Sequence, residues 1–72
     1  MNWNKTASNI LKAELKRRDI TYNKLSDLLK TLDIEESPGA ISRKINYGAF
    51  SFLFFLQCMK AIGNTSARFD ID

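Results

Sequence analysis

The second half of the chain contains a short run of side chains, residues 43–46, of types that can donate hydrogen bonds to DNA bases and phosphates. Arg43 can donate two hydrogen bonds to one guanine, and Asn46 can pair with the edge of an adenine. Lys44 lies between them and is better suited to a phosphate. The same Arg43–Lys44 pair also fits a second interpretation, in which cations near the end of a helix only stabilise its dipole.

Backbone amides at two predicted helix starts, residues 21–23 and 37–39, add to these donors. The N-terminus of a helix binds phosphate because its first N–H groups have no partner within the helix. The exposed side chains of the two segments would contribute as well. The predicted DNA-contacting residues are Thr21, Asn23, Lys24, Ser37, Gly39, Ser42, Arg43, Lys44 and Asn46.

Catalytic and metal-binding chemistry has few candidates in this sequence. The chain has no histidine and one cysteine, which excludes the standard zinc sites and the Ser–His and Cys–His catalytic arrangements. Cys58 lies in an apolar segment, where a buried, inert thiol is the expected state. Glu35 and Glu36 are neighbours at a turn and point apart, whereas paired catalytic carboxylates must converge on one substrate atom. We expect no enzyme activity, no cofactor, no metal and no small-molecule substrate.

The sequence predicts that the segments carrying these side chains are helices. Apolar residues recur at three- and four-residue steps, and no strand-like alternation of useful length appears. The expected helices cover residues 4–18, 22–32, 38–46 and 52–62. The sequence therefore predicts an all-α fold, a compact four- to five-helix bundle of helix-turn-helix type. A single domain is expected over residues 1–63, with a loosely ordered tail over 64–72.

Local signals mark the ends of these helices. The predicted N-caps are Thr21, Ser37 and Ser51, and the predicted C-terminal stops are Gly48 and Gly63. Pro38 follows its cap at the first helical position, which proline favours. Ile41 and Ile45, four residues apart, should anchor the third helix to the core.

Length, charge and hydropathy set the broad class. The chain has 72 residues, enough for one domain of marginal stability. Its hydrophobic fraction of 44% argues against disorder, and its net charge of +3 suits a phosphate-bearing partner without requiring one. The N-terminus lacks the apolar segment of a signal peptide, and the most apolar stretch, residues 49–56, is shorter than the roughly 20 residues of a membrane helix. We expect a cytoplasmic protein with no membrane contact.

The fourth predicted helix is apolar on nearly every side. At about 100° per residue, one face collects Phe52, Phe55, Leu56, Met59 and Ile62, which we expect to be the core face. The other side is the predicted homodimer interface, formed by Leu53, Phe54, Gln57 and Ala61. The alternative is that Trp3 and the tail fold over Phe54 within one chain.

The order of these features resembles a known superfamily. Leu25-Ser26, Ile41-Ser42-Arg43, Gly48 and the closing Ile62-Gly63 resemble the lambda-repressor-like helix-turn-helix proteins of phages and bacteria. That resemblance implies a third helix directed toward the major groove of DNA, dimerisation and transcriptional control. A narrower resemblance, carried by Lys44-Ile45, Gly48, Phe50-Ser51 and residues 54–57, is to small uncharacterised bacterial proteins catalogued as a domain of unknown function. It implies a bacterial or phage-like source and no known activity.

Two features leave alternatives open. Ile41 comes 12 residues after Leu29, a longer step than the short turn of repressor-like domains, and Glu35 and Glu36 lie where they would repel phosphate. Binding dominated by the DNA backbone is therefore more compatible with the sequence than base-specific reading. The favoured function is a DNA-binding transcriptional regulator that acts as a dimer. The alternative is a helical protein-interaction module, antitoxin-like or an adaptor, with no DNA binding.

Overall fold

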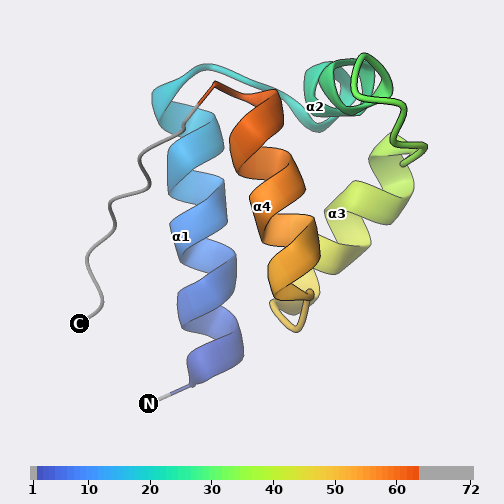
Figure 1. Cartoon of the computed structure of the whole chain (residues 1–72). Coiled ribbons are helices and arrows are strands. Elements are labelled where there is room, and N and C mark those ends of the chain that lie inside the picture. The colour runs from blue at the N-terminus through green and yellow to red at the C-terminus, as the bar shows by residue number, and fades with distance from the viewer. Residues whose placement is uncertain (1, 64–72) are drawn as a thin grey trace.

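The computed structural model describes residues 2–63, and within this range the chain forms four helices and no strand (Figure 1). The helices are α1 (Trp3–Arg17), α2 (Tyr22–Lys30), α3 (Pro38–Tyr47) and α4 (Phe52–Ala61). The predicted all-α fold and its four helices are confirmed, whereas the tail predicted for residues 64–72 lies outside the described residues. None of these four helices is long and apolar enough to cross a membrane.

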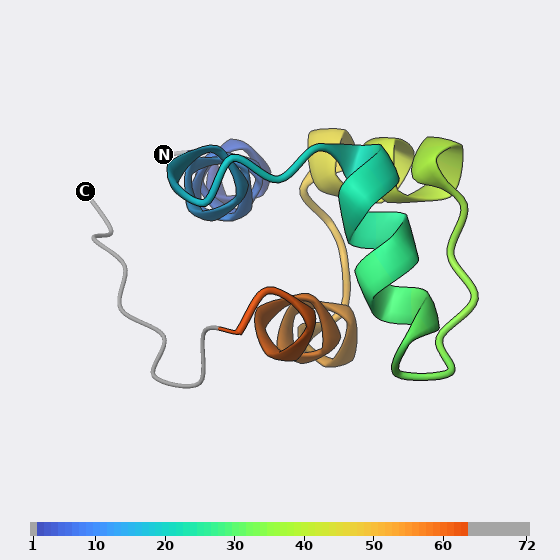
Figure 2. The ribbon, with the colours of Figure 1, turned by 90° about the horizontal axis from the view of Figure 1, so that it is seen from above.

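The helices pack around a common core (Figures 1 and 2). α1 and α4 run in the same direction, and α2 lies near the end of the molecule where both of them finish. α3 packs against both α1 and α2, and α2 also contacts α4. Figure 2 shows α2 and α3 together on one side, joined by the connection of residues 31–37. This side of the molecule carries most of the predicted DNA-contacting residues.

Each helix begins with a side chain that accepts a hydrogen bond from a backbone N–H three residues on. These pairs are Asn2 with Lys5, Thr21 with Lys24, Ser37 with Ala40 and Ser51 with Phe54, at 3.0–3.1 Å. The bond satisfies one of the N–H groups that a helix start leaves unpaired. The three caps predicted from the sequence are confirmed, and Asn2 adds a fourth.

Gly48 ends α3 in a position that no other residue fits. Its φ of +79° lies in the left-handed region, which favours glycine. A Cβ atom built on Gly48 would lie 1.9 Å from the backbone oxygen of Asn4. The missing side chain therefore lets the end of α3 rest directly on the first turn of α1.

The core takes side chains from all four helices. Its buried members are Leu11, Leu15, Leu25, Leu29, Ile41, Ile45, Phe54, Cys58, Met59 and Ile62. Ile41 and Ile45 face inward as predicted, and Cys58 is the buried thiol that the sequence indicated. Burial, with a contribution from Glu36 and an opposing one from Lys44, raises the pKa of the Cys58 thiol to about 12.

The predicted orientation of α4 is wrong in part. Phe52 and Leu56, expected in the core, are 71% and 48% exposed, whereas Phe54, expected at a dimer interface, is 4% exposed. Met59 and Ile62 are buried as predicted. The physical reason is that α4 is apolar on nearly all sides, so helical periodicity alone does not select its inner face. In the structure α4 packs against α2, and Phe54 and Cys58 face the core instead.

Candidate nucleic-acid interface

The long connection between α2 and α3 is folded against the end of α2. The N–H groups of Leu32 and Ile34 both donate to the carbonyl of Leu29, at 2.9 and 3.0 Å. The Ser26 hydroxyl donates to the carbonyl of Glu36 at 2.6 Å, which holds the last part of the connection beside the middle of α2. Ile34 packs against the core. The extra residues before Ile41 therefore form an ordered segment that fixes where α3 begins.

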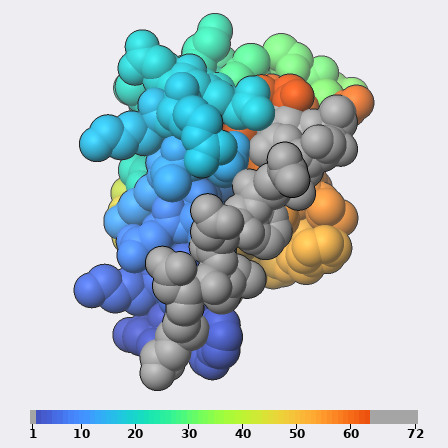
Figure 3. Space-filling view, turned by 90° about the vertical axis from the view of Figure 1, so that its left-hand side faces the viewer, coloured from blue at the N-terminus to red at the C-terminus, as the bar shows by residue number. Residues whose placement is uncertain are grey.

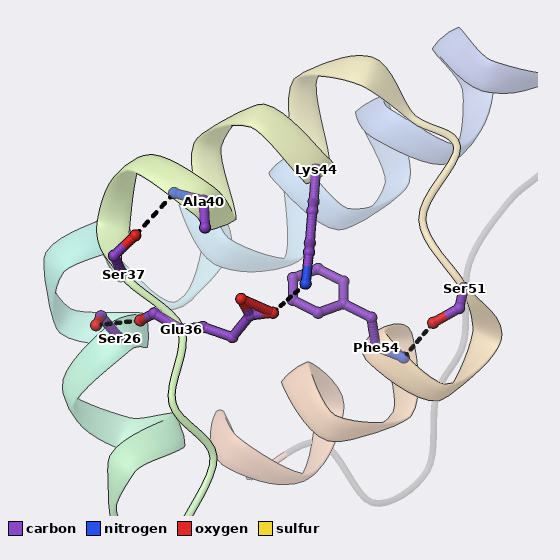
Figure 4. A network of polar contacts seen from close by, with 7 residues as sticks. All are labelled: Ser26, Glu36, Ser37, Ala40, Lys44, Ser51 and Phe54. Carbon is purple, nitrogen blue, oxygen red and sulfur yellow. Dashed lines mark hydrogen bonds and ion pairs between the residues drawn. The ribbon is translucent and has the colours of Figure 1, made fainter.

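Lys44 is engaged by side chains outside α3. Its ammonium forms an ion pair with the carboxylate of Glu36 and lies 4.9 Å from the centre of the Phe54 ring (Figure 4). The contact joins the connection, α3 and α4 through three side chains. Lys44 was predicted to bind phosphate, but its charge is directed to Glu36. The same pairing compensates the carboxylate of Glu36, which the sequence suggested would repel DNA.

The exposed face of α3 carries Gly39, Arg43, Asn46 and Tyr47. The Asn46 amide nitrogen donates to the backbone oxygen of Ser42 at 2.8 Å and to its hydroxyl at 3.0 Å. A bidentate contact to adenine needs both the amide N–H and the carbonyl of an asparagine. Because the amide nitrogen has two N–H donors, Asn46 can make that contact only by giving up at least one of its two bonds to Ser42.

Arg43 is the cation on this face of α3. Its Nη1 atom lies 3.6 Å from the position that a Cβ of Gly39 would occupy, so the guanidinium extends back over the first turn of the helix. Within residues 2–63, Arg43 forms no ion pair. Its five N–H donors are therefore available to a guanine edge or a phosphate.

The start of α2 lies beside a basic hollow of about 370 Å³ at the end of α1. The lining residues are Lys12, Leu15, Lys16, Ile20, Thr21 and Tyr22. The Thr21 hydroxyl is engaged as the helix cap, while the side chains of Asn23 and Lys24 are exposed. Figure 3 shows the end of α1 and its connection to α2, in light blue to cyan, at the upper end of one face. Lys12 and Lys16 were not among the predicted contact residues, although their spacing of four placed them on one side of a helix.

Two cations at the end of α1, Arg17 and Arg18, form ion pairs within the fold. Glu14 is 2% exposed, and its carboxylate pairs with Arg17 at 2.6 Å and with Arg18 at 3.8 Å. Arg18 also donates to the backbone oxygen of Ile62 at 3.5 Å. The cationic side chains of α1, α2 and α3 therefore fall into two groups. Arg17, Arg18 and Lys44 are paired, whereas Lys12, Lys16, Lys24 and Arg43 form no ion pair within the described part of the chain.

The comparison with protein families assigns the chain to one of them. The family model described as Domain of unknown function (DUF6471) matches residues 3–67, so the chain belongs to the DUF6471 family. No curated protein matches it, and no solved structure does. The narrower resemblance noted in the sequence, to a domain of unknown function, is confirmed at that level. None of the comparisons indicates the lambda-repressor-like superfamily, so that assignment stays a prediction.

Proposed function

We propose that this member of the DUF6471 family is a DNA-binding protein of helix-turn-helix type, lambda-repressor-like in its use of α3 toward the major groove, and that it acts in transcriptional control. The observation that carries the proposal is the two-sided character of α3. Ile41 and Ile45 are fully buried, whereas Arg43 and Asn46 are exposed on the opposite side. A helix anchored in this way presents its outer side chains in a fixed orientation, as a recognition helix must.

Charge supports the same proposal. Lys12 and Lys16 line the hollow beside the start of α2, and Lys24 lies in the first turn of that helix, where the first backbone N–H groups also attract anions. Cations at this place would hold one DNA strand by its phosphates while α3 enters the groove. The ion pair of Glu36 with Lys44 removes the repulsion expected from one acidic residue beside α3.

The contacts of Asn46 favour limited sequence reading. Its amide is committed to Ser42, which leaves Arg43 as the main side chain for base contact. Phosphate contacts position a protein on DNA but carry no sequence information. We therefore expect tight binding to depend on the backbone, with a preference for guanine near Arg43.

We also propose that the protein acts as a dimer through α4, on a surface that differs from the predicted one. Leu53 keeps its predicted place because it is 64% exposed, and Phe52 and Leu56 join it. Of the other predicted interface residues, Gln57 and Ala61 are half-buried and Phe54 belongs to the core. Exposed apolar side chains gathered on one helix are typical of protein contact surfaces.

The same surface supports the second candidate function, a helical protein-interaction module without DNA binding. In that case the exposed apolar residues of α4 would meet a different protein, and Arg43 would have no role in binding. The two candidates therefore differ in whether α3 or α4 carries the activity.

Duplex binding measured by fluorescence anisotropy at several salt concentrations tests the proposal. Substitution of Arg43→Ala should weaken DNA binding by about 1–3 kcal/mol. The plot of log K against log salt has a negative slope, and Lys16→Ala should make that slope less negative by about 1, because one phosphate contact is lost. The matched control is Lys60→Ala, which removes an exposed cation outside α2 and α3. Absence of salt-dependent binding by the wild type, or equal losses in Arg43→Ala and Lys60→Ala, would refute the role of α3.

A further inference from the structure

A second hollow, of about 630 Å³, lies where α3 ends and the chain turns toward α4. Its lining residues are Arg43, Lys44, Asn46, Tyr47, Ala49 and Phe50. Neither the fold nor the proposed contact of α3 with DNA explains an apolar hollow at this place.

One aromatic lining residue of the hollow, Phe50, is fixed in place by two other phenylalanine rings. The Phe50 ring stacks on Phe55, with centroids 6.5 Å apart and planes 9° apart, and meets Phe54 at 5.8 Å and 60°. Phe54 is itself part of the core. The Tyr47 ring, by contrast, is 73% exposed at the end of α3. The hollow is therefore lined by the fixed ring of Phe50 and the accessible ring of Tyr47, and such a pair of rings suits a flat aromatic ligand.

The charged side chains around the hollow indicate whether its ligand is an anion or a cation. Glu36 pairs with Lys44, so the charge of Lys44 is compensated. Arg43 lines the hollow, is exposed and forms no ion pair within residues 2–63. The remaining positive charge favours an anion and disfavours a cation.

We propose that this hollow binds a planar aromatic anion. The ring of the ligand lies against Tyr47 and Phe50, and its carboxylate or phosphate is held by the guanidinium of Arg43. Arg43 and Asn46 also belong to the exposed face of α3, so a bound ligand covers part of the surface proposed to meet DNA. Ligand binding stands by itself, whereas its competition with DNA rests on the proposed function.

The binding step is tested by nuclear magnetic resonance titration of the full chain with indole-3-acetate. Indole-3-acetamide, the neutral molecule of the same shape, and acetate, the anion without a ring, are the controls. We expect amide shifts concentrated in residues 43–50, and a dissociation constant about fivefold higher for the amide. Shifts spread over α4, or equal affinity for the acid and the amide, would overturn the proposal.

Variants identify the side chains that are responsible. Tyr47→Ala and Arg43→Gln should each raise the dissociation constant of indole-3-acetate about fivefold. Both residues are exposed, so neither substitution is expected to disturb folding. Leu32→Ser, at an exposed leucine that does not line the hollow, should leave the constant unchanged. An equal loss in Leu32→Ser would show unspecific apolar binding and refute the site.

Competition is measured with a labelled duplex. Indole-3-acetate should displace the duplex from the wild type, whereas acetate at the same concentration, which lacks the ring, should not displace it. If the wild type binds the ligand but no duplex, the proposed DNA function fails and the ligand site stands. If both bind without displacing one another, the shared surface is refuted.

Discussion

The ammonium of Lys44 and the carboxylate of Glu36 form an ion pair against the ring of Phe54, which ties the connection before α3 to α4 (Figure 4). Three segments that are separate in the sequence meet in this contact. The Glu36 side chain is only 15% exposed, so removal of its cation leaves a carboxylate with restricted access to water. The pair therefore contributes to the position of α3 more than a pair on the open surface would.

The first prediction concerns this pair. Lys44→Met and Glu36→Gln should each lower the free energy of unfolding by about 1 kcal/mol, because each substitution removes a partly buried ion pair, and Lys44→Met also removes the contact with an aromatic ring. The double variant should lose less than the sum of the two. Urea unfolding of the four proteins gives the coupling energy. Losses that add within about 0.3–0.5 kcal/mol would show that the pair is not coupled.

The second prediction compares two glycines with the same backbone conformation. Gly48 and Gly63 have φ of +79° and +83°. Among residues 2–63, a Cβ at Gly63 meets nothing within 4 Å, whereas one at Gly48 would clash with Asn4. Gly63→Ala should destabilise the protein by about 1–2 kcal/mol through the backbone alone. Gly48→Ala should cost clearly more, because α1 and α3 must also separate. Thermal unfolding followed by circular dichroism measures both, and equal losses would contradict the close approach at Gly48.

The third prediction concerns alkaline pH. The thiol of Cys58 has a pKa of about 12 in the folded protein against 9.0 for an unperturbed thiol, because burial disfavours the thiolate. Below pH 9 the thiol is protonated in both states, so it adds no pH dependence. Above pH 9 the unfolded chain loses the proton first, and stability should fall by up to about 1.4 kcal/mol per pH unit.

The variant Cys58→Ala isolates this effect from the titration of other groups. Unfolding in urea between pH 8 and 11, with a reductant present, should show a steeper loss for the wild type than for Cys58→Ala. Parallel curves would mean that the thiol titrates alike in the folded and unfolded chain.

The fourth prediction concerns self-association through α4. Leu53→Ser combined with Leu56→Ser should shift the protein toward a monomer, because both side chains are exposed on the surface proposed for the dimer. Sedimentation velocity over a range of concentrations gives the mass in solution. Leu32→Ser, at an exposed leucine after α2, is the matched control and should keep the mass of the wild type. A wild type that is monomeric at every concentration would exclude the dimer.

Local features of the chain were predictable from the sequence. Thr21, Ser37 and Ser51 cap the helices that follow them, and Gly48 ends α3, because each of these signals acts through backbone groups a few residues away. Ile41 and Ile45 were assigned to the core on the same basis, since α3 is apolar on one side only.

Features that depend on distant partners were decided by the tertiary structure alone. The inner face of α4 is an example, because a helix that is apolar all round buries whichever side its neighbours cover, here Phe54 and Cys58 in place of Phe52 and Leu56. Lys44 is another: its place in the sequence indicated a phosphate contact, and only folding brings it to Glu36. The sequence by itself determined where helices begin and end and that α3 has an inner face. Which cations remain unpaired, and which side of α4 is exposed, depended on packing between helices, which no local pattern encodes.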